Sequence, residues 1–209
     1  MDVEINNTTG LKLLIARAQL GSALSLFIKD RDPFSVHSLA CAGCELMEGI
    51  AESSGIGSFS THILEEHPAI DLKTIRRLRN KYWNALKHFH DRDGKTARDD
   101  ADLLSTFSDK HNDAPLFMGW HDYQAVTGRL PVEVQVFQVW WYAVYEDKLA
   151  GDADLPTIRG LFPSIRSVDR TEQKRRLRRV IEKYRRQKDL LSDTRTEVAP
   201  LVGRIRYID

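Results

Sequence analysis

The chain has 209 residues, of which 42% are hydrophobic, a content typical of a globular protein that excludes an intrinsically disordered chain. Because 31 Lys and Arg nearly balance 30 Asp and Glu, the net charge of +1 indicates no class of binding partner. The first ten residues lack a basic region followed by an apolar run, and we find no run of about 18 apolar residues that could span a membrane. We therefore expect a cytoplasmic protein with no membrane partner.

Two helices are predicted at the start of the chain, over residues 10–29 and 34–52. Between them, Asp32 is a suitable N-cap residue and Pro33 suits the first position of the second helix. That second helix is rich in Ala and Gly, and small residues allow neighbouring helices to approach closely. We therefore expect it to be the central helix of the fold.

The second predicted helix also carries the only two cysteines, Cys41 and Cys44. Neighbouring turns of one helix gain little from a disulfide, and two thiols alone cannot build a zinc site, so we interpret both as reduced core residues. His37 and Glu45 share a helix face with Cys41, and together with His88 of the third helix they are an alternative candidate for a metal site. The competing interpretation of His37 is a buried side chain bonded to a neighbouring helix.

The stretch that organises the chain is residues 71–90, DLKTIRRLRNKYWNALKHFH, which we predict to be one long helix with two faces. Apolar side chains recur every three or four residues, as in a buried stripe, and these are Ile75, Leu78, Tyr82, Leu86 and Phe89. A second row is polar and consists of Arg77, Lys81, Asn84 and His88. Every side chain of this polar row can hydrogen-bond an anion, and His88 can also transfer protons near neutral pH.

After the third helix, residues 91–113 contain seven Asp and predict a solvated connection with at most a short helix near residues 103–107. A fourth helix is predicted over residues 116–127, because Pro115 suits its start and Gly128 its end.

A fifth helix is predicted over residues 132–150, although its first turn also fits a strand. Three residues alternate there as in a strand, namely Val132, Val134 and Val136. Pro131 at the start, Gly151 at the end and the length favour a helix. A strand paired into a sheet here would contradict an all-α fold.

A sixth helix, capped by Asp169, is the most basic part of the chain. Residues 170–188 hold ten Lys or Arg and two Glu, a local charge of +8 that leaves −7 for the remainder. This density of Arg suits phosphate contact, and Tyr184 lies where it could stack on a base. The candidate nucleic-acid contacts of the whole chain are Arg77, Arg79, Arg175, Arg178, Arg179, Tyr184 and Arg185. Competing interpretations are an intramolecular clasp on the acidic connection 91–113 and a contact to a partner chain.

Together these elements predict an all-α fold, a bundle of four to five helices with an additional basic C-terminal helix. We assign residues 1–168 to the bundle domain, and residues 169–209 to the basic helix and a tail packed on the bundle. Trp120, Trp140 and Trp141 are expected in the core or at a dimer interface, and we expect a homodimer.

The segment LRNKYWNALKH, residues 78–88, and the order of the helices resemble the HEPN superfamily of small helical bundles found in toxins and antiphage systems. The ribonuclease motif of that superfamily is an Arg, a polar residue (often Asn) and a His four to six residues after the Arg, on one helix. Asn84 and His88 stand where its Asn and His would, whereas Trp83 fills the Arg position and Arg79 lies too far from His88. The segments DPFSVHSLA and KHFHDRD are also similar to a set of uncharacterised bacterial proteins.

The resemblance implies a protein that binds RNA or a nucleotide, with weakened or absent metal-independent ribonuclease activity and no cofactor. The residues themselves allow such chemistry, since His88 could act as the acid or base and Lys81 could neutralise phosphate charge, while Asn84 positions the phosphate or the imidazole. The alternatives are a non-catalytic homodimeric interaction module and a metal-binding bundle that uses His and Glu side chains.

Overall fold

The computed structural model describes residues 8–149, 151 and 153–203, whose regular structure is helical apart from one short pair of strands. The α-helices are α1 Thr8–Ile28, α2 Pro33–Ser53, α3 Phe59–Glu66, α4 Leu72–Arg79, α5 Lys81–Lys87, α6 Ala101–Ser105, α7 Asp113–Thr127, α8 Val132–Val144, α9 Leu155–Leu161, α10 Arg170–Tyr184 and α11 Lys188–Ser192. Three 3₁₀-helices join them, η1 Asp109–Asn112, η2 Glu146–Lys148 and η3 Ile165–Ser167. The all-α prediction is confirmed. The predicted count of four to five helices is wrong, because short helices fill the connections between the long ones.

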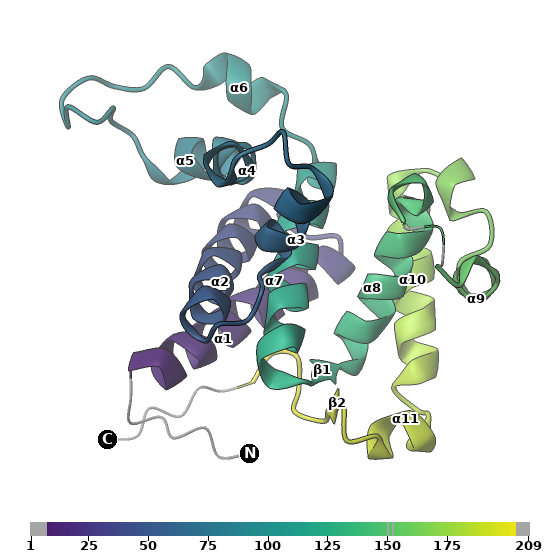
Figure 1. Ribbon diagram of the computed structural model, residues 1–209. Coiled ribbons are helices and arrows are strands. Elements are labelled where there is room, and N and C mark those ends of the chain that lie inside the picture. Colours follow the sequence, from purple (N-terminus) through teal and green to yellow (C-terminus); the bar gives the residue numbers. More distant parts are fainter. Residues whose placement is uncertain (1–7, 150, 152, 204–209) are drawn as a thin grey trace.

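The centre of the fold is α2, which packs between α1 and α7 (Figure 1). Two glycines make this possible, because a Cβ atom at Gly43 of α2 or at Gly119 of α7 would lie 2.7 Å from a side-chain carbon of Leu20 on α1. Three helix backbones therefore converge around one fully buried leucine. The expectation that small residues place the second helix at the centre agrees with this packing.

One described helix, α1, has the length and hydropathy that crossing a membrane requires, which corrects the expectation that no such stretch exists. A core helix of a soluble protein passes the same test. Leu20, Leu24 and Phe27 of α1 are fully buried in the hydrophobic core, where they contact side chains of the other long helices.

The predicted single helix over residues 71–90 is two helices, α4 and α5, and ends early. It begins as predicted, with Asp71 accepting a hydrogen bond from the backbone N–H of Thr74 (2.7 Å). The helix is interrupted at Asn80, a residue whose side chain competes for backbone hydrogen bonds. His88 is extended, so the last residues of the predicted stripe and row lie beyond the helix end.

Beyond α5 the chain forms an arm, residues 88–108, that projects from the bundle at the upper left of Figure 1. The arm reverses at Gly94, which takes a positive φ of 70°. An antiparallel bridge joins His90 to Ala97, and the backbone N–H of Arg98 donates to the carbonyl of Phe89 (3.0 Å). The predicted short helix of this connection is α6.

The fifth predicted helix is α8, so Val132 to Val136 are helical and the strand alternative is excluded. It ends at Val144, earlier than expected, and Ala150 lies outside the described residues. The described sheet is a two-stranded parallel pair, β1 Leu130–Pro131 with β2 Thr196–Glu197.

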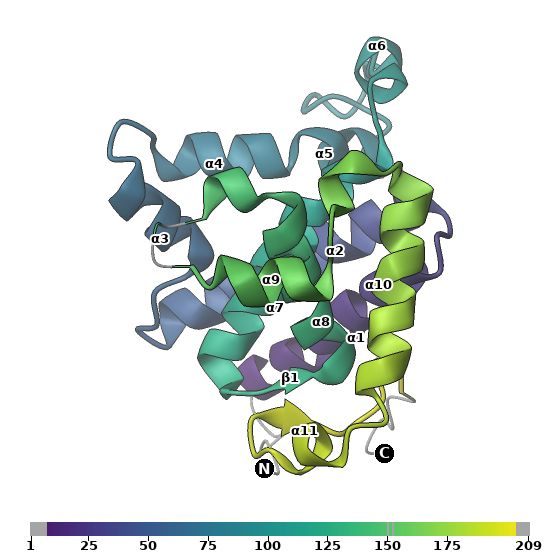
Figure 2. The ribbon, with the colours of Figure 1, turned by 90° about the vertical axis from the view of Figure 1, so that its right-hand side faces the viewer.

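The basic helix α10 runs alongside α8 (Figure 2), and buried charges fasten it to the rest of the fold. Lys174 is fully buried, and its Nζ lies 2.6 Å from Asp109 and 2.9 Å from Asp30. Arg170 pairs with Asp109 (2.7 Å) and with the buried Asp113. These contacts form the intramolecular clasp that the sequence offered as one interpretation of the basic helix.

The glycine contacts at the centre of the fold generate a paired prediction. Gly43→Ala or Gly119→Ala forces a methyl group against Leu20 in a closed core, so we expect the free energy of unfolding to fall by about 1–3 kcal/mol. Gly49→Ala is the matched control on α2, where an added Cβ meets nothing within 4 Å. There a helical Ala should stabilise by about 0.5–1 kcal/mol. Urea unfolding of the three variants measures the difference, and equal effects at Gly43 and Gly49 would contradict the proposed convergence.

Candidate functional site

The polar row predicted on the third helix lies on the surface. Arg77, Lys81 and His88 are exposed and Asn84 is half-buried. Within the described part of the chain, the ion pairs of α4 and α5 involve other arginines, so Arg77, Lys81 and the adjacent Lys87 have no carboxylate within 4 Å. The row therefore presents cations whose charge is not neutralised by the protein.

Arg79, which the sequence places among the nucleic-acid contacts, points into the protein instead. Its side chain is 3% exposed, and its Nη2 lies 3.0 Å from Oε2 of Glu48, which is equally enclosed. Its Nη1 donates to Sγ of Cys44 (3.6 Å) and its Nε to Oδ1 of Asn80 (3.1 Å). Burial alone would raise the pKa of Glu48, but the Ser60 hydroxyl and the charge of Arg79 hold it below its ordinary value. Arg79 is thus a buried structural residue, and each of its three guanidinium nitrogens has a partner within the protein.

His88 lies in an open hollow of about 380 Å³ at the base of the arm. The hollow also contains Arg98, which sequence reasoning missed because it lies ten residues further along the chain and returns only through the His90–Ala97 bridge. The turn sequence Asp-Arg-Asp-Gly at 91–94 was the available signal. Arg98 forms two hydrogen bonds to Asp100 (2.7 and 2.9 Å), which already neutralises it.

The three predicted catalytic residues are Lys81, Asn84 and His88. In the described structure, hydrogen bonds between their side chains do not fix their relative positions. Among the described residues, neither Lys81 nor the side chain of Asn84 bonds to the imidazole of His88, and the recorded contact is between the His88 backbone N–H and the Asn84 carbonyl (3.2 Å). No neighbouring group therefore orients the ring, as general acid–base catalysis requires.

The alternative metal set does not assemble. His37 is buried and its Nδ1 lies 3.0 Å from Oδ1 of Asn112, while Nε2 lies 3.5 Å from Sγ of Cys41. Burial lowers the pKa of His37 to about 4, so the ring is neutral and its Nδ1–H donates to the amide oxygen. Glu45 is exposed and His88 lies on the arm. Within residues 8–149, 151 and 153–203, no group of three or more His, Cys, Asp and Glu side chains could hold a metal ion.

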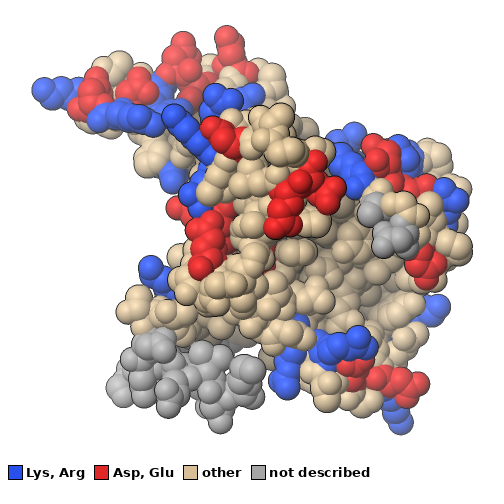
Figure 3. Space-filling view, viewed as in Figure 1, with Lys and Arg blue, Asp and Glu red and all other residues tan. Residues whose placement is uncertain are grey.

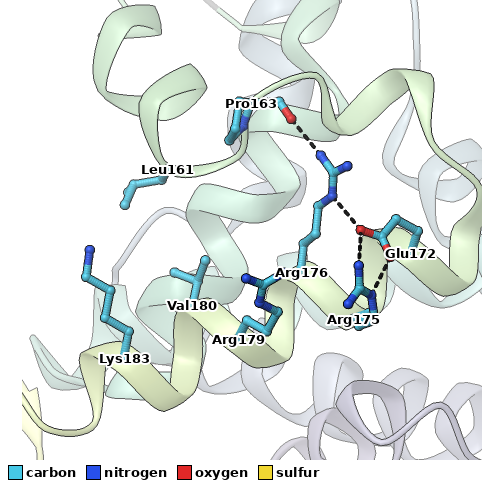
Figure 4. A pocket seen from close by; sticks show the side chains of 8 residues that line it. All are labelled: Leu161, Pro163, Glu172, Arg175, Arg176, Arg179, Val180 and Lys183. Atoms are coloured by element: carbon cyan, nitrogen blue, oxygen red, sulfur yellow. Dashed lines mark hydrogen bonds and ion pairs between the residues drawn. The ribbon is translucent and has the colours of Figure 1, made fainter.

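The basic helix α10 lines a hollow of about 530 Å³ together with the end of α9 (Figure 4). Figure 4 shows Glu172 between Arg175 and Arg176, to which it is hydrogen-bonded at 2.9 and 2.8 Å. Arg179 and Lys183 also line the hollow and form none of the ion pairs found in the described segments. Two of the four cations that line this hollow therefore share one carboxylate, Glu172.

The other α10 residues that the sequence selected lie on different faces of the helix. Arg178 donates to the carbonyl of Ile28 (2.8 Å) at the C-terminal end of α1. Arg185 pairs with Glu133 (2.7 Å), and Tyr184 is half-buried in an apolar slot of about 120 Å³. The predicted contacts of α10 thus do not form one surface, and much of its charge serves contacts within the protein.

The ion pair between Arg79 and Glu48 can be tested by measuring the free energy of unfolding of variants. Glu48→Leu leaves the buried guanidinium of Arg79 without its carboxylate, so we expect a loss of about 3–5 kcal/mol in the free energy of unfolding. The double variant Glu48→Leu with Arg79→Met removes both charges and should recover most of that loss. The control is Glu52→Gln, which breaks the half-exposed pair with Arg76 and should cost less than about 1 kcal/mol. Chemical denaturation measures all three, and a mild effect of Glu48→Leu would show that Arg79 is free.

The chain matches no protein-family model, no curated protein and no solved structure. The resemblance to the HEPN superfamily therefore remains an expectation from the sequence. What the protein binds has to be inferred from the surfaces and side chains that the structure describes.

Proposed function

We propose that the protein binds single-stranded RNA through the exposed face of α4 and α5, as a HEPN-like bundle without a pre-organised cleavage site. The observation that carries this proposal is the separation of charges on these two helices. On one face Arg79 and Arg76 are neutralised by Glu48 and Glu52. Elsewhere on the same two helices, three exposed cations have no carboxylate partner in the described structure, namely Arg77, Lys81 and Lys87.

Neutralisation of phosphates by Lys and Arg supplies most of the affinity of proteins for nucleic acids, and cations already paired with carboxylates contribute less. Residues 71–90 contain six Lys or Arg and a single Asp. The neighbouring arm mixes both signs, as the blue and red side chains at the upper left of Figure 3 show. The helical face, and not the arm, is therefore the more uniform phosphate-binding surface.

An aromatic side chain completes the expected signature of single-strand binding. Phe89 follows His88 directly and is 75% exposed. Trp83 is half-buried beneath Lys87, whose Nζ lies 3.6 Å from the ring centroid. Bases of a single strand stack on exposed aromatic rings while the phosphates follow a cationic row. Phe89 beside the row supplies such a stacking surface.

Cleavage of the bound RNA receives less support than binding. A metal-independent ribonuclease needs a proton-transfer group and a cation held against the phosphate. His88 has the first property, but no hydrogen bond from the described residues orients its ring, and Arg98 in the same hollow is paired with Asp100. We therefore infer that the surface retains RNA without cutting it efficiently.

The proposed RNA surface is tested by removing three positive charges either from α4 and α5 or from the basic segment around α10. Replacing Arg77, Lys81 and Lys87 by Gln should weaken binding of a fluorescein-labelled oligouridylate and reduce the slope of log K against log salt by about 2. The control replaces three exposed cations of α10 by Gln, namely Arg179, Lys183 and Arg186, and should leave both quantities nearly unchanged. Fluorescence anisotropy at several salt concentrations gives the answer. Loss of binding only in the α10 variant would move the site to the basic helix and contradict the proposal.

The variant His88→Ala distinguishes RNA binding from RNA cleavage. The parent protein should leave labelled RNA intact in the presence of a chelator, and His88→Ala should bind it with at most a few-fold loss. The measurement is gel analysis of the RNA beside its binding curve. Efficient cutting by the parent that falls by about a hundredfold to ten thousandfold in His88→Ala would show that this residue is a working acid or base.

A further inference from the structure

A further cavity lies beside α4 and α5, and none of Arg77, Lys81 and Lys87 lines it. Its volume is about 330 Å³, and its walls come from α2, α4, α5, η1, α7 and the end of α8 with η2. Ligand pockets commonly measure about 300–1,000 Å³, so this one suits a small molecule. None of the thirteen residues that line the cavity is Asp or Glu. Eight of them are cationic, histidine or polar aromatic residues, namely His37, Arg79, Tyr82, Lys110, His111, Trp141, Tyr145 and Lys148.

The short helix η1 fixes the cationic side of this cavity. Its Asp109 and Asn112, with Asp113 just beyond it, point inward to the buried partners Lys174, His37 and Arg170. The two residues between these anchors, Lys110 and His111, line the cavity. Because the flanking side chains are locked by buried contacts, the backbone that carries Lys110 and His111 is held in place before any ligand arrives.

The cavity offers hydrogen-bond donors that the described protein does not use. Lys110 and Lys148 form no ion pair among the described residues. Nδ1 of His111 lies 2.9 Å from the backbone nitrogen and 3.0 Å from the carbonyl oxygen of Ser108, so Ser108 holds the ring by that nitrogen. Arg79 also lines the cavity, but its guanidinium is paired with Glu48. The two lysines therefore give the cavity a preference for an anion.

Three aromatic side chains also line the cavity, together with five apolar residues. Trp141 stacks on Phe117 with ring centroids 4.0 Å apart, and Tyr145 lies tilted against Trp141 at 4.8 Å. Tyr82 of α5 contacts the ring of His111, with centroids 4.5 Å apart. Aromatic rings bind planar groups well through their faces and edges.

We propose that this cavity binds a small planar aromatic anion, whose ring lies between Tyr82 and Trp141 and whose charge meets Lys110 and Lys148. Two sources share this chemistry, a nucleoside monophosphate and an aromatic carboxylate. The site is distinct from the RNA surface, since none of Arg77, Lys81 and Lys87 lines the cavity. The two proposals therefore stand or fall separately.

The test is binding to the full chain by calorimetry and thermal unfolding, with adenosine and uridine monophosphates in one arm and indole-3-acetate in the other. Inorganic phosphate and indole, which each carry half of the proposed chemistry, are the controls. A ligand that binds the folded protein raises the melting temperature as its concentration exceeds Kd. Binding in either arm supports the proposal and identifies the source of the ligand, and binding in neither at millimolar concentration overturns it.

Paired variants locate the site. Lys110→Gln with Lys148→Gln should unfold at the parent temperature without ligand and lose about tenfold to a hundredfold in affinity for each Lys removed. Arg179→Gln with Lys183→Gln removes the same charge from the α10 hollow and should leave affinity unchanged. The Gln variant of Arg77, Lys81 and Lys87 should also bind the small anion as the parent does, even where RNA binding is lost. Unchanged affinity in the Lys110 and Lys148 variant would overturn the assignment.

Discussion

Two cations of α10, the buried Lys174 and the half-buried Arg170, join this helix to the N-terminal part of the fold through aspartates. Lys174 is fully buried against Asp109 and Asp30, and Arg170 joins Asp109 to Asp113. Removing charged groups from water costs several kcal/mol each, so such groups are tolerated only when every partner is present. Both cations also lie over the ring of Phe27, at 4.3 and 5.1 Å. The N-terminal helices, η1 and the C-terminal helix therefore depend on one another.

This dependence changes the meaning of the charge on the basic helix. Its local charge of +8 is the strongest electrostatic signal in the sequence, and a surface helix of that charge would suit nucleic acid. In the structure Arg170 and Lys174 pair with aspartates, and Arg185 pairs with Glu133. Arg179, Lys183 and Arg186 stay exposed in the basic segment, as Arg77, Lys81 and Lys87 do on α4 and α5. For binding, the number of cations that the fold leaves unpaired therefore matters more than the total number of cations in a segment.

Features of the sequence that act locally were predictable. Asp32 caps α2 with Pro33 in its first turn, Asp169 accepts a hydrogen bond from the backbone N–H of Glu172 (2.8 Å), and Gly128 ends α7 in the left-handed conformation. Each of these depends on neighbouring residues along the chain, which sequence patterns report directly. The all-α class follows from the same local signals and from the helical spacing of buried residues.

Features set by distant contacts were not predictable from the pattern. Helical spacing places Leu78 in the buried stripe, yet it is 65% exposed, and Arg79 beside it is buried because Glu48 lies opposite. Periodicity identifies a face but does not say which partner covers it. Arg98 likewise reaches His88 only through the turn of the arm.

Native-state hydrogen exchange tests the interdependence of the helices most directly. If buried charges join α10 to the N-terminal helices, the slowest amides of α1, α7 and α10 should open with the same free energy and the same dependence on denaturant, as one cooperative unit. Opening of α10 at a free energy several kcal/mol below that of α1 and α7 would show that the basic helix is only docked, and would contradict this account.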